Sequence, residues 1–184
     1  MYQLVLFLHL LTIAIAFFAM GTMISSVLRL RAATDVASAR AAALAASGVE
    51  KVMPVATVLL LLTGAYLTQT RWTWTTPWID VSIAGLLIVT VFGAGALGGR
   101  QRALDRVLTR ASALDAATTR LVLDPFLLVG GVADMGLVAG VMFVMVVKPP
   151  LFAGIAALIV GAACGAFAGA SAIRPAAVLR RVGG

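Results

Sequence analysis

The separation of charged from apolar residues constrains this chain most. Charged residues gather in short segments, and the five stretches between them are almost wholly apolar. A helix needs about 20 apolar residues to cross a bilayer. The five stretches meet that length and cover roughly residues 3–28, 52–70, 80–99, 125–147 and 150–173. Only helices and closed barrels satisfy their backbone in lipid, and barrel strands would alternate in polarity. The sequence therefore predicts an all-α, polytopic membrane bundle of five transmembrane helices, forming one domain over residues 1–184.

Composition agrees with a membrane protein. Hydrophobic residues make up 62% of the chain and charged residues 11%, against about 25% charged in soluble domains. A net charge of +7 would suggest a nucleic-acid partner in a soluble protein. Here the basic residues flank apolar runs, so we expect no nucleic acid. We expect the partners to be the bilayer and its anionic headgroups on the cytoplasmic side.

The basic residues also predict an orientation. Twelve of the 14 Lys and Arg residues follow the first, third and fifth apolar runs. The positive-inside rule makes those segments cytoplasmic, so the N-terminus is outside and the C-terminus inside. All three tryptophans, Trp72, Trp74 and Trp78, then fall at the outer surface, where aromatic belts lie. Richness in Ala, Gly and Arg is typical of bacteria with GC-rich genomes. We therefore expect a multi-pass protein of the bacterial inner membrane.

The connections differ in kind. Arg102, Arg106 and Arg110 recur every fourth residue beside an apolar face. This spacing predicts an amphipathic helix that either continues the third span or lies on the inner headgroups. Lys148 precedes Pro149, which disfavours helical backbone at Lys148. The sequence here predicts a tight turn and an antiparallel hairpin of the last two spans.

Asp134 is a carboxylate within an apolar run, about 13 Å from its inner end by helical rise. Thr22, Thr63 and Thr90 fall at a similar depth. An ionised Asp there costs about 2.5–3.5 kcal/mol. We expect a mostly neutral carboxyl that hydrogen-bonds a hydroxyl such as that of Thr90. Two interpretations stay open: a proton or cation site, or a buried polar contact that fixes packing.

His9 lies about 9 Å from the outer end of the first run. Tyr66, Met142 and Met145 fall in the same outer half of the membrane. The histidine could be an axial haem ligand, a copper ligand with Met142 or Met145, or a packed residue bonded to Tyr66. The pattern assigns no metal ligand set and no cofactor, and haem or copper stays an alternative.

Gly161, Gly165 and Gly169 recur every fourth residue on the fifth span. Such a glycine zipper lets two helices approach closely. The contact could lie within the chain, or between chains of a homo-oligomer or larger membrane complex. The single cysteine, Cys164, excludes an intramolecular disulfide.

Three short motifs carry a resemblance. They are "LHLL" in the first span, "LLLLTGAYL" before the tryptophans and "VMFVMVVKPPL" at the end of the fourth span. Together they resemble a bacterial family of integral membrane proteins of unknown function. That family is similar to the copper-resistance membrane protein D and to haem-binding protoporphyrinogen oxidase membrane proteins. The resemblance implies a helical bundle with a first-span histidine, here His9, and it implies no activity.

Motifs of soluble chemistry, such as Walker loops, zinc-protease helices and nucleophile elbows, do not occur in this sequence. We therefore favour a non-enzymatic accessory or structural subunit of a membrane assembly. One alternative is a haem- or copper-binding protein that uses His9 in redox chemistry or metal handling. Another is a proton-coupled transporter that uses Asp134.

Overall fold

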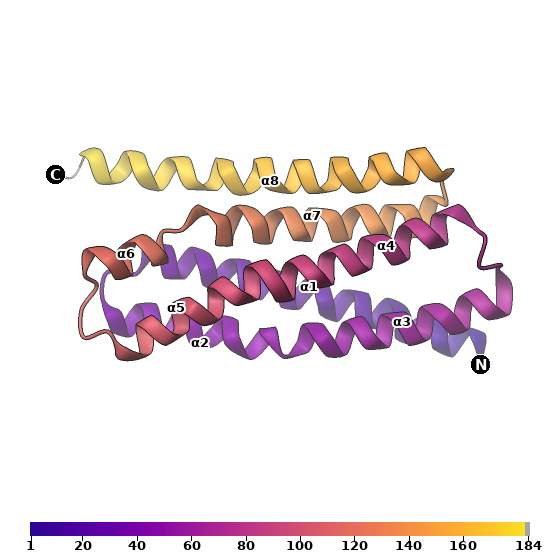
Figure 1. Cartoon of the computed structure of the whole chain (residues 1–184), viewed down its shortest axis with the longest axis horizontal. Coiled ribbons are helices and arrows are strands. Elements are labelled where there is room, and N and C mark those ends of the chain that lie inside the picture. Colours follow the sequence, from indigo (N-terminus) through magenta and orange to yellow (C-terminus); the bar gives the residue numbers. More distant parts are fainter. Residues whose placement is uncertain (183–184) are drawn as a thin grey trace.

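A computed structural model describes residues 1–182, and over this range the chain is helical with short connections. The long helices lie lengthwise in an elongated bundle (Figure 1). The elements are α1 (Tyr2–Ala32), α2 (Val36–Glu50), α3 (Val52–Arg71), α4 (Pro77–Val91), the π-helix η1 (Phe92–Leu97), α5 (Gly98–Arg110), α6 (Ala116–Val122), α7 (Pro125–Val147) and α8 (Leu151–Val182).

Five helical stretches of the described chain are long and apolar enough to cross a membrane. They are Tyr2–Ala32, Val36–Arg71, Pro77–Arg110, Ala116–Val147 and Leu151–Ile173. Each contains or matches one of the five runs expected from the sequence. The protein is therefore a helical bundle of the multi-pass membrane type. Four of these stretches have more than 30 residues and reach roughly 46–54 Å, more than the ~30 Å hydrocarbon layer.

The two ends of the bundle differ in composition. The tryptophan end holds the N-terminus, the α3–α4 connection with its tryptophans, and the α7–α8 turn at Lys148. The arginine end holds α2, α5 and α6 (Figure 1). Lys148 caps α7 in the left-handed region, with φ 55° and ψ 51°, and its N–H donates to the Val144 carbonyl. The expected tight turn is present, and left-handed backbone is how Lys148 leaves the helix before Pro149.

At the arginine end, the helices beyond the apolar runs pack on one another rather than lie apart. α5 continues the third span through η1, and it packs on α2. Its Leu104 and Leu108 are buried with Leu30 of α1 and Ala39 of α2. Arg40 of α2 donates hydrogen bonds to the carbonyls of Leu108, Thr109 and Ala111, which end α5. Of the two interpretations of the arginine stripe, the helix that continues the third span is the one found.

Four helices, α1, α3, α4 and α7, form a ring in which α1 packs on α3 and α7, and α4 packs on α7 and more sparsely on α3. α8 lies outside this ring along α7 (Figure 1). Glycines make the α7–α8 contact close. A Cβ on Gly165 would lie 2.9 Å from the Cα of Ala133, and one on Gly169 would lie 2.9 Å from the Cα of Val129. The glycine stripe of α8 thus contacts α7 of the same chain.

Candidate functional site

A cavity of about 660 Å³ lies inside the ring of α1, α3, α4 and α7, near the tryptophan end. Its walls are mostly aliphatic. Its polar or aromatic lining residues are Tyr2, His9, Thr68, Trp72, Trp74, Trp78, Ser82 and Lys148. Small-molecule sites have this character: volumes of about 300–1,000 Å³, apolar walls and few polar groups.

His9 is the buried titratable group of the cavity wall, with 7% of its surface exposed. Its ring packs against α3 at Gly64, where a Cβ would lie 3.5 Å from His9 Cε1. Nδ1 lies 2.7 Å from the Thr63 hydroxyl oxygen. That hydroxyl donates to the Leu59 carbonyl at 2.6 Å, as threonines in helices commonly do. The adjacent residues Thr63 and Gly64 of α3 therefore hold the imidazole ring of His9.

At the tryptophan end, the cavity is lined by a cation that lies among aromatic rings. Lys148 Nζ lies 4.4 Å from the centre of the Trp72 ring and 5.8 Å from that of Trp78. The two indoles meet edge to face with centres 5.1 Å apart. Beside them, Arg71 lies over the ring of Tyr2 at 4.8 Å. These cation–π contacts tie the α3–α4 connection to the α7–α8 turn and to α1.

The structure brings together most of the residues expected around His9. Met142 and Met145 of α7 line the same cavity as His9. Tyr66 does not line it and is 40% exposed. The histidine is bonded to Thr63 instead of Tyr66. Within the described chain, no three His, Cys, Asp or Glu residues gather as a metal site.

The residues expected around Asp134 do not assemble. Thr22 donates to the Phe18 carbonyl, and Thr90 donates to Leu86 and lies 3.4 Å from Thr57 Oγ1. Thr63 is engaged with His9. Asp134 is 5% exposed, and its Oδ1 has no hydrogen-bond partner among the described residues.

Asp134 faces the π-helix instead. A Cβ on Gly93 of η1 would lie 3.2 Å from Asp134 Oδ2. Within η1, the carbonyl of Ala94 accepts a hydrogen bond from Arg102. π-Helical turns are rare and occur often at functional sites. η1 has the glycine-rich sequence "FGAGAL", from which no irregular turn is predicted.

Sequence reasoning also missed the cavity roles of Lys148, Ser82 and Thr68. The signal for Lys148 was available, because it is one of two basic residues in the connections near the tryptophans. Ser82 and Thr68 carried none. Hydroxyl residues of this kind are common in helices. Only the arrangement of α3 and α4 in the bundle places Thr68 and Ser82 at one cavity.

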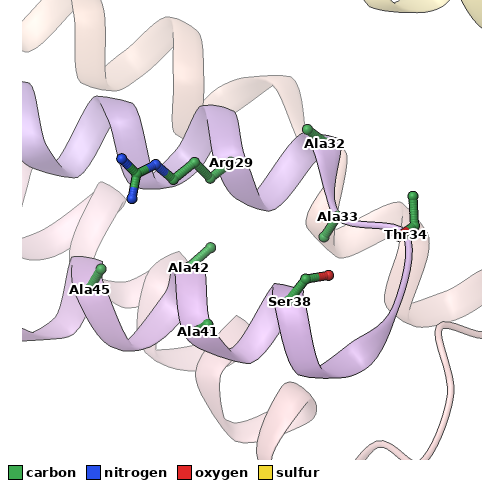
Figure 2. Close-up of a pocket in the computed structure, with 8 residues that line it drawn as sticks. All are labelled: Arg29, Ala32, Ala33, Thr34, Ser38, Ala41, Ala42 and Ala45. Atoms are coloured by element: carbon green, nitrogen blue, oxygen red, sulfur yellow. The ribbon is translucent and has the colours of Figure 1, made fainter.

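A second, smaller hollow of about 400 Å³ lies at the arginine end between α1 and α2. Figure 2 shows its lining: alanines from α1, α2 and their connection, Thr34 and Ser38, with Arg29 extended along α1. Arg29 is exposed. The hollow offers one cationic group above an alanine surface, so it is a shallow site with little to bind specifically.

Comparison of the chain with protein-family models, with curated proteins and with solved structures finds no match. The functional argument therefore depends on the geometry of the site.

Proposed function

We propose that this protein is a non-enzymatic membrane protein that binds an apolar small molecule in the cavity at its tryptophan end. The observation that carries the proposal is His9, a buried imidazole in the wall of a mostly aliphatic cavity of about 660 Å³. Polar groups in such sites fix the orientation of a ligand and give specificity. An accessory subunit that holds such a molecule for a larger membrane assembly is compatible with this role.

The test uses the tryptophans, because all three line the cavity. Protein in lipid nanodiscs is titrated with a dodecyl-substituted bromophenol, whose bromine quenches indole fluorescence. We expect saturable quenching. Phenylalanine at Ala65, which lines the cavity, should weaken binding at least about tenfold, since a filled cavity excludes the ligand. Ala163→Phe, at an exposed position of α8, is the matched control and should bind as the wild type does. Linear, unsaturable quenching in all three proteins would overturn the proposal.

Haem or copper binding at His9 is the second candidate. The observation that favours it is that Met142 and Met145 of α7 line the same cavity as His9 of α1. An imidazole with thioethers suits Cu(I) or the axial positions of haem. In chemical type these donors suit either group, which would supply electron-transfer chemistry if His9 and a methionine held it. A Soret band or stoichiometric copper in purified protein, lost in His9→Ala, would support this candidate. The resemblance to copper-resistance protein D and the haem-binding oxidases, which rests on three short motifs, is proposed together with this candidate.

For Asp134 we propose a packing role against η1 over proton-coupled transport. Its surroundings support this: the cavity does not include Asp134, and the three threonine hydroxyls expected near it are engaged elsewhere. Transport would be favoured if Asp134→Asn folded normally yet abolished a pH-dependent flux.

We further propose that the arginine end is cytoplasmic, in a bacterial inner membrane, with anionic headgroups around exposed arginines such as Arg29 and Arg106. Cysteine labelling tests the orientation: a cysteine at Thr75 should react from outside, and one at Arg106 only from inside. The stripe of Gly161, Gly165 and Gly169 we interpret as a glycine zipper that serves α7–α8 packing, which leaves other faces for a second copy or a partner subunit.

A further inference from the structure

The Thr63 hydroxyl decides which nitrogen of His9 carries the proton. Thr63 Oγ1 lies 2.6 Å from the Leu59 carbonyl oxygen and 2.7 Å from His9 Nδ1. A carbonyl oxygen only accepts, so at that distance the single hydroxyl hydrogen points to Leu59. Thr63 then has only lone pairs to offer the histidine. Nδ1 must be the donor, and it carries the ring proton.

If the ring is neutral, the other nitrogen, Nε2, carries no proton and has a lone pair that can accept a hydrogen bond. No carboxylate lines the cavity, and the charged group that does is Lys148, which has the same sign as an imidazolium. A charged His9 would therefore be a buried charge without a counter-ion, which is costly. Among the described residues, Nδ1 has a hydrogen-bond partner and no bond to Nε2 is found. With Nδ1 committed to α3, Nε2 is the nitrogen left for the cavity.

We infer that Thr63 holds His9 as the Nδ1–H tautomer, so that the cavity selects a lipid-soluble molecule whose aromatic ring carries a hydroxyl, of the phenol or hydroquinone class. The inference rests on the proposed binding function and adds the ligand class to it. A hydroxyl donates to bare Nε2, whereas a carbonyl or ether oxygen meets it lone pair to lone pair.

The preference for an aromatic ring follows from the lining. Trp72, Trp74 and Trp78 stand at one end of the cavity, and Met142 and Met145 lie on its α7 wall. Indoles stack on aromatic rings, and thioether sulfur makes favourable contacts with ring edges. The aliphatic remainder of the walls suits an alkyl or isoprenoid tail. Thr63 itself does not line the cavity, so it acts as a positioning residue.

The tautomer can be measured without any ligand, because the chain has one histidine. Nitrogen NMR of protein labelled only at histidine distinguishes protonated from bare ring nitrogens. We expect a protonated Nδ1 and a bare Nε2 in the wild type. Addition of para-dodecylphenol should shift the Nε2 resonance, and para-dodecylanisole, whose oxygen cannot donate, should not. A protonated Nε2 in the ligand-free wild type would overturn the inference.

Binding selectivity is the second test. Both compounds compete against the bromophenol probe in nanodiscs of one lipid composition. We expect the phenol to bind about tenfold tighter than the anisole, the scale of one hydrogen bond. Thr63→Val removes the group that holds the proton on Nδ1, so both tautomers become accessible. The ratio of phenol to anisole affinity should then fall to about twofold. Thr90→Val removes a comparable threonine hydroxyl away from the cavity and should keep the wild-type ratio.

The outcomes separate the two proposals. If the bromophenol never saturates, the proposed binding function fails. If it saturates but phenol and anisole compete equally in the wild type, the cavity binds ligands and the tautomer inference fails. Thr63→Ser, which retains the hydroxyl, guards against a folding defect: it should keep the preference, and loss of the preference in a folded Ser variant would count against the inference.

Discussion

Asp134 of α7 and Gly93 of the π-helix lie in contact, so close that a Cβ on Gly93 would be 3.2 Å from Asp134 Oδ2. The carboxyl is buried, and its Oδ1 lacks a hydrogen-bond partner among the described residues. A buried, unsatisfied polar atom costs about 1–3 kcal/mol. Valine is apolar and close to aspartate in size. Asp134→Val should therefore leave the free energy of unfolding unchanged or raise it by about 1 kcal/mol. Reversible unfolding in detergent measures this, and a loss of several kcal/mol would show that Asp134 has a partner.

The α7–α8 contact predicts an unusual order of severity. Gly165→Leu must push α8 away from the backbone of Ala133, so we expect it to cost more than about 4 kcal/mol. Leu158→Ala, at a buried leucine of the same helix, should cost about 2–3 kcal/mol. Ala163→Leu, on the exposed face of α8, should cost nothing measurable. Equal stability of Gly165→Leu and Ala163→Leu in a thermal-unfolding assay would contradict the close contact.

Lys148 combines a left-handed backbone with a cation over two indoles. Two substitutions separate these effects. Lys148→Ala removes the cation and keeps the unfavourable φ, whereas Lys148→Gly removes both. The glycine variant should be about 1 kcal/mol more stable than the alanine variant. Chemical unfolding of the pair measures the difference, and an alanine variant as stable as the glycine variant would argue against strain at this turn.

Arg40 bonds three carbonyls at the C-terminal end of α5. Arg40→Ala leaves them without this donor and should lower the free energy of unfolding by about 2–3 kcal/mol. Arg40→Lys should recover only part, because an ammonium cannot spread over three acceptors as a guanidinium does. Arg106→Ala is the control at an exposed arginine of α5. A loss as large in Arg106→Ala as in Arg40→Ala would show that general charge, and not capping, is responsible.

Asp115, the N-cap of α6, gives a pH-dependent prediction. The hydroxyl of Thr118, and then its backbone N–H, hold the pKa of Asp115 below its ordinary value. A lowered folded-state pKa means that the cap stabilises α6 above the ordinary pKa and is lost as pH falls through the lowered one. The Thr118 amide resonance should titrate with a midpoint below the ordinary pKa of an aspartate. In Asp115→Asn, which caps without titrating, the resonance should not follow this titration.

The spans could be predicted from the sequence, and the contacts between them could not. Apolar length is a local property, so each of the five runs corresponds to a helical stretch found in the structure. Depth was less reliable. Thr63 was expected near Asp134 because its depth was counted from the inner end of a short run, but that run belongs to a stretch, Val36–Arg71, that extends much farther toward the arginine end. Counted from Arg71, Thr63 lies at the level of His9.

The residues of the cavity could likewise be predicted only in part. Met142, Met145 and His9 could be grouped by depth, because α1 begins and α7 ends at the tryptophan end. The exclusion of Tyr66 depends on the rotation of α3 about its axis, which is set by packing. η1 was beyond prediction, since glycine permits a π-turn without specifying one.

Close backbone packing also has a mechanical consequence for the ring. α7 cannot rotate about its own axis without driving side chains into the backbone of α8 at Gly161 and Gly165. The cavity wall that α7 supplies is therefore stiff. α4 packs on α7, whereas α3 shares only a sparse contact with α4. We therefore expect any widening of the cavity as it fills to come from a displacement of α3 against α4, while α7 keeps its place.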